Sequence, residues 1–311
     1  MPGIVLSACL LSACGGGGGG GGASVAPSFP LGSTPSTTPQ DLTTLPQLTE
    51  LQVTFSTAAS VEIANGSYFV SLPAAPRVGI RTSAGAIVEV ALSVPGVLSA
   101  GFTNIAPQPL DNNVVPSLAW ASERRTVNSR LATIDLIDPE VGQLQYHTFG
   151  TWGYQQSTPL RSSIGYVVLG APTPTGSVPT TGSASYSGAM TAIYTAASLG
   201  SDSLFDVTAQ ANALVDFNAR SVTFSTSNTV RQSLVNAVVT PDAALNLSGV
   251  LSYGPGANAF SGTITTANGL SGTANGAFFG PLGQEIGGAF VLRDNHTTPT
   301  THMFGAFGLH Q

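Results

Sequence analysis

Two of the four histidines lie close enough in the sequence to act together on one ligand. His296 and His302 flank residues 297–301, a Thr- and Pro-containing segment that we expect to join the last two strands. Imidazole is a common ligand of haem iron and of transition metals, so this pair is a candidate haem site. No cysteine and no carboxylate beyond Asp294 accompanies the pair. We therefore expect no metal centre, and polar loop residues are the alternative interpretation.

No sequence pattern for catalysis is present. The sequence lacks a Gly-x-Ser-x-Gly nucleophile motif, a His-Glu-x-x-His zinc motif and a Gly-x-x-x-x-Gly-Lys phosphate loop. Asp206 and Asp216 share one face of an expected strand, but a ten-residue separation is too long for them to act as a pair. We therefore expect no catalytic residue and no cofactor, and predict a protein that is not an enzyme.

One cysteine has a clear chemical interpretation. Residues 4–13 form a short apolar run, followed by Leu11-Ser12-Ala13-Cys14. This motif resembles the lipoprotein box of bacteria, in which the cysteine is acylated and the preceding peptide is removed. We expect residues 1–13 to be a signal peptide and Cys14 to be the lipidation site that joins the protein to outer-membrane lipid. Cys9 is the alternative, and the lack of a basic residue before the apolar run leaves open a start upstream of Met1.

The residues that follow have the composition of a spacer. Of residues 15–49, 24 of 35 are Gly, Pro, Ser or Thr, and eight glycines follow Cys14 directly. Such a segment buries too little apolar surface to offset its ordering entropy. We expect residues 14–49 to be an acylated, disordered tether. Gly15, where a retained lipoprotein usually has Asp, favours passage to the outer membrane.

The composition excludes several classes of protein. Only 8% of the 311 residues are charged, no Lys occurs and the net charge is −6, so nucleic acid is not an expected partner. Apolar runs are too short for a membrane-spanning helix. Both cysteines lie in the first 14 residues, so we expect no disulfide. The 42% hydrophobic content is enough for a buried core, and we expect a monomeric, β-rich, exported protein.

Short alternating segments predict strands over most of the chain. Residues 50–155 contain several of them separated by turn residues, and we expect a small β-rich region, with residues 119–130 as a possible short helix. Residues 156–311 are more regular. Between Phe205 and Phe217 the odd positions are apolar or Ala, which predicts a half-buried strand. Eight or nine such strands predict an antiparallel up-and-down barrel of eight strands.

The C-terminal motifs are similar to those of a known family. Ser271–Pro281, Glu285–Phe290 and Phe304–Gly308 resemble the end of the transferrin-binding protein B-like β-barrel domain, and Val178–Gly188 and Leu214–Phe217 resemble its earlier strands. The resemblance implies an all-β lobe, with a β-rich handle followed by an eight-stranded barrel, on a surface lipoprotein of Gram-negative bacteria. It also implies capture of a ligand, and the chain has room for one lobe.

Three hypotheses for the function follow. The first is an outer-membrane lipoprotein that binds an unknown protein or small-molecule ligand from a host or the environment, such as an iron source. The second is a passive structural or adhesive module of the envelope. The third is a transmembrane barrel, because alternation alone does not distinguish an apolar interior from a lipid-facing surface.

Overall fold

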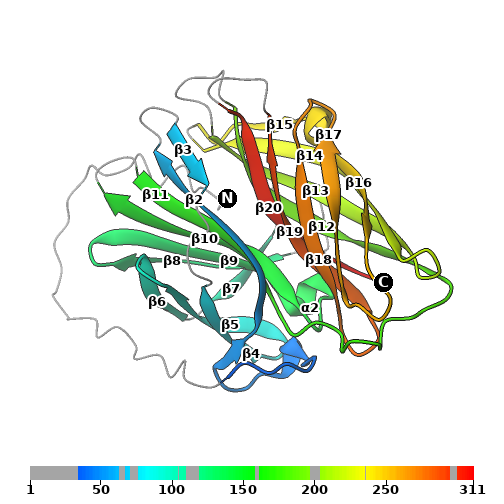
Figure 1. The fold of residues 1–311 in the computed structure, drawn as a ribbon. Helices are drawn as coiled ribbons and strands as arrows, with labels where there is room; N and C mark the ends of the chain where they lie inside the picture. Colours follow the sequence, from blue (N-terminus) through cyan, green and yellow to red (C-terminus); the bar gives the residue numbers. More distant parts are fainter. Residues whose placement is uncertain are drawn as a thin grey trace.

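The computed structural model of this chain is an all-β structure made of a handle and a barrel (Figure 1). It describes residues 34–62, 67–70, 76–103, 105–109, 119–157, 161–196, 204–234, 236–294 and 300–311. The handle, residues 49–169, consists of a four-stranded and a seven-stranded sheet, and the eight-stranded antiparallel barrel follows it. This confirms the predicted fold class. None of the helices in the described segments is long and apolar enough to cross a membrane.

The handle is a pair of sheets with one core between them. The smaller sheet has the order β1-β4-β5-β6 and the larger one the order β3-β2-β11-β10-β9-β8-β7. Their strands are β1 (Thr49–Leu51), β2 (Val53–Glu62), β3 (Ser67–Val70), β4 (Arg77–Ser83), β5 (Ala86–Val94), β6 (Leu98–Thr103), β7 (Ala106–Pro109), β8 (Ala119–Val127), β9 (Arg130–Ile137), β10 (Thr148–Ser157) and β11 (Arg161–Leu169). The helical turns η1 (Leu42–Thr44) and α2 (Pro139–Gly142) lie at one end.

The barrel is a meander whose last strand closes it. Each strand pairs with the next, β20 also pairs with β12, and the short strand β15 adds to β14. The elements are β12 (Ser183–Thr195), β13 (Leu204–Asp216), β14 (Ser221–Ser233), β15 (Val239–Pro241), η4 (Ala243–Leu245), β16 (Leu247–Ser252), β17 (Ala259–Thr266), β18 (Ser271–Phe279), β19 (Glu285–Arg293) and β20 (His302–His310).

Aromatic side chains fill the barrel interior, and glycines make room for them. A Cβ atom at Gly288 would lie 2.5 Å from the ring of Phe307, and one at Gly276 would meet the ring of Phe260. These inward glycines explain the alternation of Gly with Phe in the sequence. A contiguous apolar cluster therefore occupies the interior, as in a barrel whose side chains form a packed core.

The directions in which the barrel side chains point test the hypothesis that the barrel crosses a membrane. The odd-numbered residues of β13, from Phe205 to Val215, point into the barrel, whereas the outward positions of β12, β14, β16, β17 and β18 that face away from the handle are mostly Ser, Thr and Asn. A barrel that crosses a bilayer places an apolar band on its outer surface. The observed orientation is the reverse, so we set this alternative aside.

Two expectations about the handle differ from the structure. Residues 119–130, considered as a short helix, contain strand β8 and its turn. Trp120 lies in the core toward the barrel and Ala121 in the core between the handle sheets, so the first three residues are buried on both faces. The polar run Ser122–Thr126 follows them, so no apolar–polar alternation marks the strand. Strand β11, counted with the predicted barrel 156–311, pairs with β10 and β2 in the handle, and the barrel begins at β12.

Candidate functional site at the handle–barrel junction and the distal end

The molecule has two ends that differ in chemistry. We call the end that holds Asp41–Leu45 and the start of β19 the tether end, because the predicted tether joins the fold there. We call the opposite end, where β12, β14 and β19 finish and β15 lies, the distal end (Figure 1). The junction between handle and barrel runs from one end to the other.

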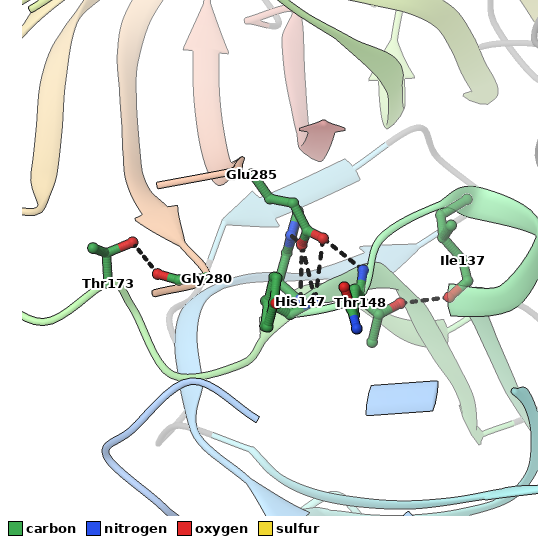
Figure 2. A network of polar contacts seen from close by, with 8 residues as sticks. Ile137, His147, Thr148, Thr173, Gly280 and Glu285 are labelled. Atoms are coloured by element: carbon green, nitrogen blue, oxygen red, sulfur yellow. Dashed lines mark hydrogen bonds and ion pairs between the residues drawn. The ribbon is translucent and has the colours of Figure 1, made fainter. Parts of the chain in front are cut away.

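A buried carboxylate fastens the two units at the tether end. Glu285, the first residue of β19, accepts hydrogen bonds from the backbone N–H groups of Gln145 at 2.5 Å, Tyr146 at 3.0 Å and His147 at 3.1 Å. Figure 2 shows Glu285 reaching from the barrel to His147, whose Nδ1 lies 2.7 Å from Oε2 of Glu285. Glu285 therefore ties three consecutive backbone N–H groups of the handle loop, and the ring of His147, to the first residue of β19.

Two outward glycines of the barrel accommodate this histidine. The His147 ring is fully buried and stacks on Phe279 with ring centroids 4.6 Å apart. A Cβ atom at Gly287 would lie 2.7 Å from its Cδ2, and one at Gly308 would lie 2.7 Å from its Nε2 and 2.5 Å from Phe149. Gly287 and Gly308 therefore let the handle pack directly on the barrel wall.

The end of the predicted tether binds to the same loop. The backbone N–H of Leu42 donates to the carbonyl of Gln145 at 2.7 Å, and the side-chain amide of Gln145 donates to Asp41 at 2.7 Å. Leu42 is buried, and the backbone of Leu45 exchanges hydrogen bonds with Thr82 of β4. Gln145 thus contacts the tether, the handle and, through Glu285, the barrel.

A hydroxyl bridges the middle of the junction. Tyr166 of β11 is fully buried, and its ring meets Phe304 of β20 edge to face at 5.7 Å. Its hydroxyl forms hydrogen bonds with Thr151 of the handle and Thr191 of the barrel. Burial, together with the nearby charge of Asp206, raises the pKa of Tyr166 well above its usual value, so it remains a neutral link between the two units.

Charged and aromatic side chains gather on the barrel at the distal end. Nε of Arg231 lies 3.3 Å from the Asp242 carboxylate, and its guanidinium lies 4.8 Å from the centre of the Phe205 ring. Tyr194 packs beside Phe205, with ring centroids 6.1 Å apart, and burial raises its pKa, with Asp242 adding to the effect. Arg and Tyr are the residue types that most often anchor protein–protein contacts.

Two exposed valines lie at the same end of the barrel. Val238 is 57% exposed, and Val239, the first residue of β15, is 38% exposed. They follow β14, the strand that carries Arg231, and β15 pairs back onto that strand. Val239 pairs with Gln232, the residue after Arg231, so its side chain lies on the opposite face of the sheet from Arg231, and the two valines form a separate exposed apolar edge at the distal end.

A groove opens on the handle toward the same end. It has a volume of about 320 Å³ counted to its open side, and its lining comes from β9, β10 and β11: Leu131, Thr133, Gly153, Tyr154, Gln155, Ser162 and Ile164. The hydroxyl of Thr133 is buried and has no hydrogen-bond partner in the described part of the chain. Because that hydroxyl is shielded from solvent, the groove presents an almost wholly apolar lining.

The structure places only one of the predicted site residues. His302 begins β20 at the distal end, where burial, aided by the charge of Arg293, lowers its pKa. A neutral imidazole is the form that binds haem iron. His296 and Cys14 lie outside the described residues, so the histidine pair and the lipidation site stay predictions. Within the segments described, no three His, Cys, Asp or Glu side chains gather as a metal site.

The junction residues were not identified from the sequence. His147 and Glu285 are 138 positions apart, and no local pattern links a loop histidine to a strand glutamate. The available signal was the Glu-x-Gly-Gly motif at 285–288, which now has a physical explanation. Glu285 holds the loop at Gln145–His147, Gly287 makes room for His147 and Gly288 makes room for Phe307.

The comparisons with known proteins agree with this architecture. Residues 178–311 match the family model described as the C-lobe and N-lobe beta barrels of Tf-binding protein B. No curated protein sequence matches the chain.

Two solved structures share the fold over most of this chain. One is a mutant of the vaccine antigen transferrin binding protein B from Haemophilus parasuis, with a TM-score of 0.51, 15% identity, and coverage of 82% of this chain and 45% of that one. The other is intact Ap-TbpB with its N and C lobes, with a TM-score of 0.51, 14% identity, and coverage of 84% and 46%. The chain therefore spans less than half of the length of these proteins, and it has a transferrin-binding-protein-B-like fold, in which residues 178–311 match the family's barrel model.

Proposed function

We propose that this chain is a lipid-anchored protein of the bacterial outer membrane that binds a protein ligand through its distal end and catalyses no reaction. The observation that carries the proposal is the combination of a transferrin-binding-protein-B-like fold with two exposed valines and a partly exposed Arg231–Asp242 ion pair at the end opposite the point where the tether joins. A tether at one end leaves the other end free to meet ligands.

The anchor rests on Cys14 and the composition that follows it. The lipoprotein box supports acylation of Cys14, and residues 15–40 supply a spacer before the chain docks at Asp41 and Leu42. Two or three acyl chains hold a protein firmly on a membrane, because each buried CH₂ contributes about 0.8 kcal/mol.

Ligand capture is tested with immobilised full-length chain and a panel of serum proteins that includes transferrin. We expect one protein to be retained, and expect Val238→Asp with Val239→Asp to reduce its binding at least tenfold, since the pair lies in the contact surface. Leu282→Asp is the matched control, because Leu282 is 60% exposed but lies at the tether end. Equal losses in both variants, or no retained protein at all, would contradict the proposal and favour the passive envelope module.

Haem is a second candidate ligand because His302 is a neutral imidazole at the distal end. Hemin titration of the full-length chain would shift the Soret band, and His302→Ala would remove the shift. His310→Ala is the control, because His310 ends β20 at the opposite end. An unshifted band in the unmodified protein rules out the haem site.

A further inference from the structure

A short segment near the end of the predicted tether is folded onto the handle. We call Asp41–Leu45 the strap, and it contains the helical turn η1. The side chains of Leu42 and Leu45 are buried in the core of the handle. The carboxylate of Asp41 accepts the backbone N–H of Thr43 at 2.9 Å and so caps the turn. The strap is therefore a structured element with apolar contacts of its own.

The strap binds both the smaller sheet of the handle and a loop on the surface. At β4, the backbone N–H of Leu45 donates to the hydroxyl of Thr82, and the N–H of Thr82 donates to the carbonyl of Leu45, each at 2.8 Å. At the loop between α2 and β10, the carbonyl of Gln145 accepts the N–H of Leu42, and its side-chain amide donates to Asp41, each at 2.7 Å. The strap thus joins β4 to this loop.

A single peptide group of that loop carries a contact to the strap and a contact to the barrel. The group joins Gln145 to Tyr146: its carbonyl accepts the N–H of Leu42, and its N–H donates to the carboxylate of Glu285 at 3.0 Å. A peptide group is planar and rigid, so a rotation that breaks one of these hydrogen bonds misaligns the other. Hydrogen bonds in such a chain also polarise one another, so each strengthens its neighbour.

The loop has little regular structure to hold this peptide group in place. Gln143 ends α2 in the left-handed conformation, with φ of 54°, and the described residues 144–147 belong to no helix or strand. Leu144 and His147 are buried, whereas Gln145 is exposed and Tyr146 is partly exposed. The backbone between the two buried residues is therefore fixed by its hydrogen bonds to the strap and to Glu285.

We propose that the strap and the Glu285 contact are coupled through this peptide group, so that detachment of the strap loosens the handle–barrel junction. The element with two states is the loop, which is ordered when both contacts form and opens when one is lost. Coupling of this kind is reciprocal, so loss of the Glu285 contact weakens the docking of the strap to the same extent. If the proposed anchor at Cys14 holds the chain on a membrane, tension on the tether acts first on the strap and through it on the junction.

The test is hydrogen exchange of the full-length chain, followed at single backbone amides. The N–H of His147 donates to Glu285 and reports on the junction, and the N–H of Leu42 donates to Gln145 and reports on the strap. Asp41→Ala removes a carboxylate whose described hydrogen bonds go to the strap and to Gln145. It should speed exchange at His147 by about fivefold or more, and Glu285→Gln should do the same at Leu42, as expected for residues that share one network.

A matched control has the same chemistry elsewhere on the barrel. The carboxylate of Asp216 accepts the backbone N–H groups of Asn218 and Ala219 in the β13–β14 turn, both at 2.9 Å. Asp216→Ala should therefore leave both reporter amides unchanged. The N–H of Thr173, which donates to the carbonyl of Phe278, is the internal reference for global stability and should keep its exchange rate in every variant.

Two results overturn the inference. Unchanged exchange at His147 in Asp41→Ala, whether or not Leu42 exchanges faster, shows that the strap and the junction are independent. An equal acceleration at Thr173 shows a loss of global stability in place of coupling. If Glu285→Gln does not fold, Asp41→Ala decides alone, because Asp41 is partly exposed and its loss leaves both cores intact. These measurements need neither a ligand nor a membrane, so their outcome is separate from that of the proposed function.

Discussion

At the scale of single residues, the packing of the handle on the barrel depends on two glycines, Gly287 and Gly308, that have no side chain. Gly287 and Gly308 are the two positions on the barrel wall where a methyl group would strike His147. Neither glycine needs a left-handed backbone, so the requirement is space alone. The Glu285 carboxylate then binds a loop that has come within reach only because those side chains are missing.

Gly287→Ala is expected to destabilise the protein by about 1–3 kcal/mol, the usual cost of an added group in a closely packed core. The new methyl would lie 2.7 Å from Cδ2 of His147, a ring that is stacked on Phe279 and has little room to move. Denaturant unfolding measures the change. Gly254→Ala is the control, since nothing lies within 4 Å of that position, and equal stability of the two variants would contradict the packing argument.

The buried hydroxyl of Tyr186 makes the free energy of unfolding decrease at alkaline pH. Burial raises the pKa of Tyr186 to about 12, and its hydroxyl donates to the carbonyl of Gly283 at 2.6 Å. Between about pH 10 and 12 the unfolded chain loses this proton and the native chain keeps it, so the free energy of unfolding decreases as pH rises. Its contribution is present below pH 10 and is lost by pH 12.

Tyr186→Phe should lessen that slope by about 1.4 kcal/mol per pH unit, the value for one proton, while Tyr166 keeps its own effect. Urea unfolding at pH 9, 10 and 11 gives the slope. The variant should also be less stable at neutral pH, because the carbonyl of Gly283 and the side chain of Gln311 lose a partner. An unchanged slope would show that Tyr186 titrates normally in the native protein.

At the scale of elements, the sequence pattern predicted the strands that have one buried and one solvent-exposed face. Strand β13 is an example, since its alternation from Phe205 to Phe217 matches the observed burial. Strand β8 was not predicted because its sequence does not alternate: Ala119–Ala121 are buried and a run of polar residues, Ser122–Thr126, follows. Strand β11 was assigned to the barrel because its pairing with β2, a strand distant in sequence, leaves no local signal, although its other partner β10 directly precedes it. The His147–Glu285 contact was beyond prediction for the same reason, as it depends on a pairing across 138 positions.

The helical turn η1 belongs to the folded unit although its sequence looks like spacer. Leu42 and Leu45 are buried, and Asp41 binds Gln145. A chain of residues 46–311 should therefore be less stable than one of residues 34–311 by about 1–3 kcal/mol, the burial of two leucines less the entropy of ordering a short segment.

Thermal unfolding of the two truncated chains, with the full-length chain beside them, measures this difference. We expect residues 34–311 to match the full-length chain, because the segment removed is predicted to be spacer. If all three chains unfold at one temperature, η1 contributes nothing and the tether extends to Thr49.

At the scale of the whole molecule, the proposed anchor and the two ends of the fold define an orientation. Cys14→Ser should release the protein from the membrane fraction into the soluble fraction, since a single uncleaved apolar stretch of ten residues is too short to span a bilayer. Fractionation and labelling with a fatty-acid analogue check this outcome. Label that persists in Cys14→Ser and disappears in Cys9→Ser would move the anchor to Cys9.

Strand β20 has a consequence for how the chain reaches this structure. It pairs with β12 and β19, and it supplies Phe304 and Ala306 to the core between barrel and handle. Until those last residues are available, the barrel stays open, and the handle face that carries Phe149 and Tyr166 has no surface to cover it. A chain delivered with its N-terminus first must therefore wait for its final strand before the barrel closes and the junction is covered, and during that wait the unpaired edges of β12 and β19 are open to pairing with other strands.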